Sequence, residues 1–129
     1  MLLRAKDLTG EDLSGADLHE IDFRGCVLAG VNFDHANLRG ANLEGCDLYW
    51  GFLCGANFSH ANLSRAKLNG ANLKDANLQS ANLCGADLGR DANGRPAKIA
   101  GANFASAFYD EATVFPEGFD PSRLGMTKV

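Results

Sequence analysis

Carboxylates are the first residues of this chain whose spacing could support chemistry. Asp7, Asp12, Asp17 and Asp22 follow one another at intervals of five residues. Carboxylates that converge on one point can bind calcium or carry out acid–base catalysis. A second possibility is a cysteine beside a histidine, which could form an activated nucleophile, and His35 and Cys54 are the candidates. Whether either group converges depends on the elements that carry it.

Those elements are set by a repeat that covers most of the chain. From Lys6 to Arg90, seventeen consecutive pentads have Leu or Phe at their third position. A small residue, most often Ala, stands two positions earlier, and Asn or Asp usually lies between them. This alternation directs the small and large residues inward and the polar residue outward. The fifth position is often Gly, which permits the positive φ of a tight corner.

Each pentad is therefore predicted to be a very short strand followed by a corner. Such a strand can bury its apolar side only if successive coils stack around a shared axis. The pattern resembles the pentapeptide-repeat family, whose motif is Ala-(Asp/Asn)-Leu-X-X, and Thr113-Val-Phe-Pro-Glu-Gly-Phe-Asp-Pro121 is similar to the ending of many cyanobacterial members. The resemblance implies an all-β fold, a right-handed quadrilateral β-helix with four pentads per coil, about four to five coils and a C-terminal cap.

The chain divides into four parts of one predicted domain, residues 1–129. Regular repeats cover 6–90, a loop or bulge covers 91–101, final repeats cover 102–116 and a cap covers 113–129. The last, weakened unit is Ala112-Thr-Val-Phe-Pro, and the expected cap residues are Phe108, Tyr109, Phe115 and Phe119. Met1-Leu2-Leu3 offers little cover at the other end, which favours a monomer or a weak end-to-end dimer.

The coil argues against both chemical sites. The four early aspartates would point outward from four different sides, so they could not share a metal ion or a proton. His35 and Cys54 would lie on an open wall without a pocket or oxyanion donors. We therefore predict no enzyme, no catalytic residues, no metal and no cofactor. Cys26 and Cys46 replace the small inward residue one coil apart; buried thiols are the simpler interpretation, and a disulfide stays open.

The asparagines form columns with a twenty-residue spacing, such as Asn37, Asn57 and Asn77. Stacked amides can hydrogen-bond along the axis and fix the register of the coils. We expect this structural role for them and no binding site.

An aromatic segment fits the repeat least well. Tyr49 and Trp50 fall at corner positions, and Phe52 replaces the usual Asn or Asp. Gly30 and Gly70 flank Trp50 in its column, which leaves room for the indole to lie against the wall. Exposed apolar groups on a polar surface suggest a partner-binding patch; the alternative is that the rings only cover a wall made irregular by Gly51. The second candidate surface is in the interrupted stretch: Asn93, Gly94, Arg95, Pro96 and Lys98.

The composition and net charge narrow the range of possible functions further. The net charge of −4, with both signs mixed, does not predict a nucleic-acid-binding face. No long apolar run indicates a membrane span, and the N-terminal residues do not resemble a signal peptide, so a cytoplasmic protein is expected. The favoured function is a rigid, non-catalytic module that binds an unidentified protein. The alternative, suggested by the family, is a DNA-mimicking binder of DNA gyrase or topoisomerase, but the columns form no continuous anionic strip.

Overall fold

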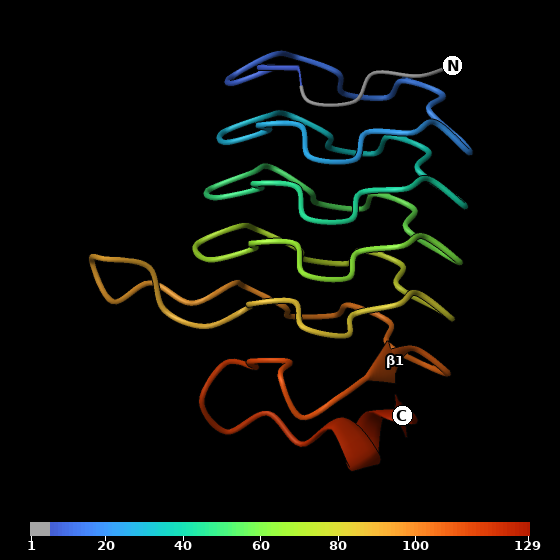
Figure 1. Ribbon diagram of the computed structural model, residues 1–129, viewed down its shortest axis with the longest axis vertical. Helices are drawn as coiled ribbons and strands as arrows, with labels where there is room; N and C mark the ends of the chain where they lie inside the picture. Colours follow the sequence, from blue (N-terminus) through green and yellow to red (C-terminus); the bar gives the residue numbers. More distant parts are fainter. Residues whose placement is uncertain (1–5) are drawn as a thin grey trace.

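The computed structural model describes residues 6–129 and shows a column of stacked coils (Figure 1). The predicted N-terminal cover, Met1 to Leu3, lies outside the described residues. Parallel bridges join the second residues of pentads that are twenty positions apart, beginning with Asp7 and Val27. Three further ladders begin at Asp12, Asp17 and Asp22, so the coil has four sides. The four early aspartates therefore start four different ladders, as expected from the four-sided coil that the family resemblance implied.

The axis of the coil is filled with apolar side chains. The third residue of every pentad from Phe23 to Leu88 is fully buried, and so are the small residues that precede most of them. Leu8, Leu13 and Leu18, at the N-terminal end, are only partly buried. The predicted inward direction of the Leu, Phe and Ala positions is confirmed. These side chains fill the axis along this part of the column.

The corners are held by the polar residue of the same pentad. The Oδ1 atoms of Asn37, Asn57 and Asn77 accept hydrogen bonds from the backbone N–H two residues later, at 3.0–3.1 Å. This corrects the expectation that the amides bond mainly along the axis. A side-chain oxygen reaches its own corner more readily than the next coil, and the corner N–H needs an acceptor. Asn37 also bonds along the axis, where its Nδ2 donates to Asp17 Oδ1 at 3.2 Å.

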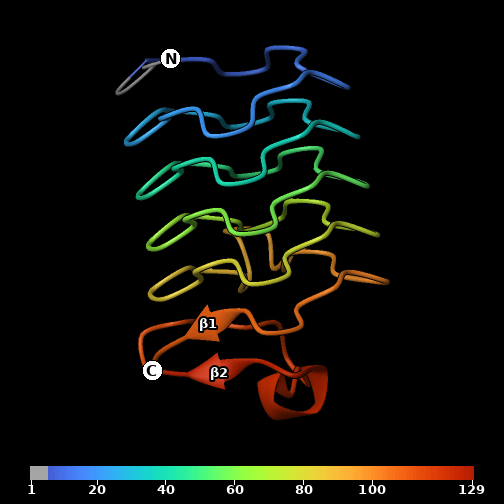
Figure 2. The ribbon, with the colours of Figure 1, turned by 90° about the vertical axis from the view of Figure 1, so that its right-hand side faces the viewer.

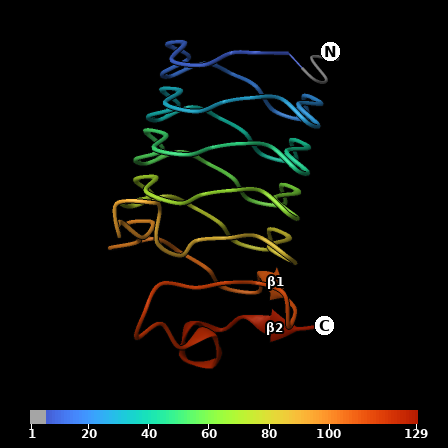
Figure 3. The ribbon, with the colours of Figure 1, turned by 60° about the vertical axis from the view of Figure 1, so that its left-hand side comes forward.

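The interruption of the repeat is shorter than predicted. Ala97 is buried as a small inward residue, and Lys98 bridges to Asn72 on the regular ladder. The N–H of Ala97 donates to Leu88 O, as Ala71 donates to Leu68 O in the uninterrupted wall. Residues 97–101 are thus a regular pentad, and the expected loop of 91–101 shrinks to an insertion of residues 91–96. That insertion projects from one side of the column (Figures 1 and 3).

The C-terminal end contains the few regular elements. Strand β1 (Phe108–Tyr109) pairs in parallel with β2 (Thr127–Lys128), and the short 3-10 helix η1 (Pro121–Leu124) lies between them in sequence (Figure 2). Phe119 stacks on Phe115 with ring centroids 4.4 Å apart. It also meets Phe104 edge-on, while Phe115 meets Tyr109.

Two details of the predicted cap are wrong. Phe108 bridges to Asn82 and is 39% exposed, so it is an outward residue of the wall rather than part of the aromatic cap. Val114 bridges to Asp87 and is also exposed, so it is an outward residue, whereas the unit Ala112-Thr-Val-Phe-Pro placed it at the inward third position. One extra residue in the preceding corner shifts the register of the last unit, and Phe115 takes the inward place.

Candidate functional site

Trp50 occupies the last position of its pentad, where the backbone turns the corner. Its φ is 57°, in the left-handed region, and its side chain is 47% exposed. Bulky residues rarely adopt this conformation, which costs roughly 1–2 kcal/mol for a residue with a Cβ. The turn itself does not need an indole, because Gly30 and Gly70 make the same corner in the neighbouring coils with φ of 66° and 69°.

The indole lies against the wall at Gly70, as the glycine column predicted. A Cβ placed on Gly70 would come within 2.6 Å of Trp50 Cδ1 and 3.1 Å of Asp91 Oδ2. Trp50 Nε1 donates a hydrogen bond of 2.8 Å to that same carboxylate oxygen. Gly70 therefore leaves the space in which the indole meets the first residue of the inserted loop.

Asp91 also organises the loop itself. Its Oδ1 accepts hydrogen bonds from the N–H groups of Asn93 and Arg95, both at 2.8 Å. The backbone closes the same turn, because Asp91 N–H donates to Arg95 O and Gly94 N–H donates to Asp91 O. The hydrogen bond from the Arg95 backbone, followed by that from Trp50, lowers the pKa of Asp91 below its ordinary value. One carboxylate thus joins the loop to the aromatic corner.

A cavity of about 290 Å³ lies where the corner and the loop meet. One wall is formed by the rings of Tyr49 and Trp50, whose centroids are 5.5 Å apart at an angle of 37°. The remaining lining residues are polar, apart from one alanine: Asn69, Asp87, Arg90, Asp91 and Ala92. Tyr49 and Trp50 of the candidate patch line this cavity together with Asp91 and Ala92 at the start of the insertion, whereas none of the five candidate loop residues lines it.

Not every candidate residue belongs to that cavity. Phe52 is 52% exposed but bridges to Asn32 and Asn72 on the adjacent side of the coil, around the corner from Trp50. Lys98, on the same ladder as Phe52, is exposed in the regular wall. In the loop, Asn93, Gly94 and Arg95 are exposed and Pro96 is half-buried.

The thiols show no sign of an activated nucleophile. Partial burial raises the pKa of Cys54, and the nearby Asp34 carboxylate adds to this effect. Cys26 and Cys46 are buried as thiols; Cys46 Sγ donates to Phe23 O, and burial raises the pKa of Cys46 to about 12. Thiols with raised pKa values are poor nucleophiles because little thiolate is present at neutral pH.

Among residues 6–129, no three His, Cys, Asp or Glu side chains are grouped as metal ligands would be. No helix in this part of the chain has the length and apolar character needed to cross a membrane.

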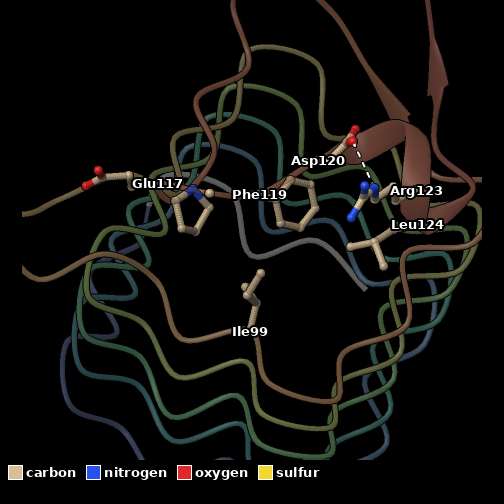
Figure 4. Close-up of a pocket in the computed structure, with 8 residues that line it drawn as sticks. Ile99, Glu117, Phe119, Asp120, Arg123 and Leu124 are labelled. Carbon is tan, nitrogen blue, oxygen red and sulfur yellow. Dashed lines mark ion pairs between the residues drawn. The ribbon is translucent and has the colours of Figure 1, made fainter.

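A second cavity, of about 380 Å³, opens at the C-terminal end of the column. Figure 4 shows Ile99 below Phe119, with Leu124 beside them and an ion pair between Asp120 and Arg123 of 3.6 Å. Ile99 is the inward residue of its pentad and is only partly buried. The aromatic cap therefore leaves part of the last coil uncovered.

Comparison with known proteins identifies the repeat. The family described as Pentapeptide repeats matches residues 7–48 and 53–90 in eight copies, which is more than half of the chain. The chain belongs to the pentapeptide-repeat family. A search of curated protein sequences gives no match.

Solved pentapeptide-repeat structures agree with the fold. HetL is a protein involved in heterocyst differentiation regulation in the cyanobacterium Nostoc sp. strain PCC 7120. It is 29% identical to this chain, with a TM-score of 0.61 over 85% of this chain. The chain spans 59% of the length of HetL. Rfr23 from the cyanobacterium Cyanothece 51142 is 26% identical with a TM-score of 0.54, covering 88% of this chain and 87% of Rfr23. These relatives imply that the four-sided coil is right-handed.

QnrB1, a plasmid-mediated fluoroquinolone resistance protein, shares 17% identity with a TM-score of 0.41, covering 99% of this chain and 81% of QnrB1. This likeness is too low to carry an argument about function.

The pentapeptide pattern did not reveal the polar half of the cavity. Asp91 and Asn69 were missed because one begins the insertion and the other is an ordinary corner residue in the repeat. A partial signal exists in the column that contains Trp50, since Gly70 and then Arg90 follow it at intervals of twenty residues. It indicates that the residues after Arg90 lie near the indole, but not which of them binds it.

Proposed function

We propose that this pentapeptide-repeat protein is a non-catalytic interaction module that binds a protein partner through Tyr49, Trp50, Phe52 and the loop 91–96. The observation that carries the proposal is the half-exposed indole of Trp50, which lies at a corner where glycine serves in the neighbouring coils. The left-handed backbone alone does not distinguish it, because seven other non-glycine residues among those described, including His35 and His60, adopt the same conformation. An exposed aromatic ring on a polar wall is typical of a contact site.

The surface has the character of a contact site. Trp and Tyr are the residue types that most often dominate binding energy at protein interfaces. Here Tyr49 and Trp50 are in ring contact, and the hydrogen bond to Asp91 orients the indole before any partner arrives. A partner that meets a fixed ring loses less entropy on binding than one that must order it.

Other functions receive less support. A DNA-mimicking binder of gyrase or topoisomerase would need a continuous anionic surface. The ladder that begins at Asp7 holds three aspartates, but Lys67 and two valines interrupt it. Catalysis would need an enclosed site with an activated group, whereas the axis is filled by Leu and Phe, and the pKa values of Cys46, Cys54 and Cys84 are raised. Thiols that stay reduced suit a cytoplasmic location, which we include in the proposal.

The test is a comparative pull-down from a lysate of the source organism. The variant Trp50→Gly/Phe52→Asn restores the residue types that the repeat favours at both positions, so its fold should be preserved. The matched control is His60→Gly/Phe108→Asn, because His60 has φ of 59° at another corner and Phe108 is an exposed wall phenylalanine. We expect a partner that the wild type and the control retain and that the patch variant loses. Equal retention by all three proteins would refute the proposed surface.

A further inference from the structure

A buried polar atom in the wall of the cavity beside Trp50 has no hydrogen-bond partner among the described residues. Asn69 lines the cavity and is 3% exposed. Its Nδ2 donates to Gly89 O at 3.2 Å and to Arg90 O at 3.3 Å, which fixes the orientation of the amide. Its Oδ1 has no hydrogen-bond partner among the described residues and is closed to solvent, so a donor in the cavity would reach it only after a small movement of the wall.

The other polar groups of the cavity also favour a ligand that donates hydrogen bonds. Asp87 and Asp91 are carboxylates. Asp87 accepts a hydrogen bond from the N–H of Gly89, and Asp91 accepts hydrogen bonds from the loop and from Trp50. Carboxylates can accept several further hydrogen bonds. Arg90 is the one cation in the lining, and its Nη2 is paired with Glu117 Oε2 at 2.9 Å.

The wider surroundings are nearly balanced in charge. Lys67 stands between Asp47 and Asp87 in the ladder, and Arg95 lies near enough to Asp91 to lower its pKa slightly further. Long-range attraction of a cation is therefore weak, and recognition would depend on direct contact inside the cavity.

The aromatic wall complements these acceptors. A cationic group over the face of Trp or Tyr is attracted by the ring electrons. A volume of about 290 Å³ suits one side chain better than a whole cofactor. We propose that the cavity binds the ammonium or guanidinium group of a single lysine or arginine side chain presented by the protein partner. This inference rests on the proposed interaction function and specifies the chemistry of its site.

The test uses Trp50 as its own reporter, because it is the only tryptophan in the chain. Its indole N–H gives one cross-peak in a nitrogen–proton correlation spectrum. The probes are N-acetyl-arginine methylamide and N-acetyl-lysine methylamide, with the citrulline and norleucine analogues as neutral counterparts. We expect the basic probes to shift this cross-peak saturably with millimolar affinity, and the neutral probes to bind about tenfold more weakly or not at all.

Three variants locate the interaction. Asp87→Asn keeps an oxygen for the corner hydrogen bond but removes the charge, and Asn69→Ala removes the unpartnered acceptor. We expect each to weaken the basic probes about fivefold or more. Asp12→Asn makes the same change on a different ladder and should leave the affinity unchanged. Retained peak dispersion confirms that each variant is folded.

The outcomes separate this inference from the proposed function. Equal binding of arginine and citrulline probes, or no shift of the indole peak by any probe, would overturn the cation site. The pull-down could still support the contact surface in that case. If the basic probes bind as expected but the patch variant retains every partner, the cavity chemistry stands and the proposed function falls.

Discussion

Trp50 shows how one residue can complete a corner and present a functional group at the same time. Its backbone adopts the left-handed conformation used by Gly30 and Gly70, so the coil continues without interruption. Its side chain lies in the space above Gly70 and reaches the carboxylate of Asp91. The geometry of this corner therefore depends on a glycine that has no side chain of its own to contribute.

Replacement of that glycine tests this dependence. In Gly70→Ala the new methyl group would overlap Trp50 Cδ1, so the ring must move away from Asp91. We expect a loss of about 2 kcal/mol in the free energy of unfolding, because the left-handed alanine is strained and the indole hydrogen bond is lost. Urea melts measure the first effect, and a red shift of the single tryptophan emission reports the second.

Gly30→Ala is the matched control for this change. Gly30 has φ of 66°, but a Cβ there would meet nothing within 4 Å. We expect a cost of about 1 kcal/mol from the backbone alone and no change in tryptophan emission. If the two variants had equal stability and equal emission, the indole would not rest on Gly70 as described.

At the scale of single residues, the sequence predicted where side chains lie better than it predicted which side chains hydrogen-bond to one another. The column of Gly30, Trp50 and Gly70 was sufficient to place the indole against the wall, because the repeat fixes which residues stack. The hydrogen bond to Asp91 and the buried amide of Asn69 could not be predicted. They depend on the path of an irregular loop, which the repeat does not determine.

Among the elements, the loop 91–96 is an insertion into an otherwise continuous wall. The pentad that ends at Arg90 and the pentad that begins at Ala97 would be directly consecutive without it. The hydrogen bond from Ala97 N–H to Leu88 O already closes the base of the loop as an ordinary corner would. The sequence analysis placed the end of the loop too late because Ala97-Lys-Ile-Ala-Gly101 has Lys where Asn or Asp is usual.

Deletion of residues 91–96 should therefore leave the fold intact. The shortened chain keeps its phase, and the cost of closing a short loop is small. We expect an unfolding free energy within about 1 kcal/mol of the parent protein. Trp50 would lose the acceptor for its Nε1, so its emission should shift to the red and binding of the basic probes should disappear.

A deletion of equal length within the regular repeats serves as the control for the loop deletion. Removal of Ala81 to Ala86 also takes out six residues, but it shifts the pentad phase by one position and directs inward side chains outward. That variant should fail to fold cooperatively. If circular dichroism and urea melts instead showed that both deletions are equally disruptive, the loop would be part of the coil and not an insertion in it.

Considered as a whole, the molecule is a nearly one-dimensional stack in which each coil contacts the coils before and after it. The repeat predicted stacked coils with a buried axis, and the resemblance to the pentapeptide-repeat family implied their four sides. The register of the pentads at the C-terminal end of the column was harder to predict. One additional residue before Thr113 moves Val114 outward, and Phe108 faces solvent instead of the cap. The number of coils stays a prediction.

In such a stack, the effect of a core substitution should depend on its position along the axis. Leu68 is fully buried with coils on both sides, whereas Leu8 lies in the first described coil and is only partly buried. Leu68→Asp would place an unpaired carboxylate among leucines, and we expect a loss of about 4 kcal/mol or more. Leu8→Asp can be accommodated by local fraying of the end, at a cost of about 1 kcal/mol.

Urea melts of the two variants, followed by far-ultraviolet circular dichroism, measure this difference. Asn72→Asp serves as the control, because its side chain is outward and an aspartate can accept the same corner hydrogen bond from Lys74 N–H. Near-parental stability of Leu68→Asp would mean that this leucine is not in the core. Equal, large losses for Leu8→Asp and Leu68→Asp would show that the column unfolds as one cooperative unit from its first coil, so that its ends are as firmly held as the coil that carries Trp50.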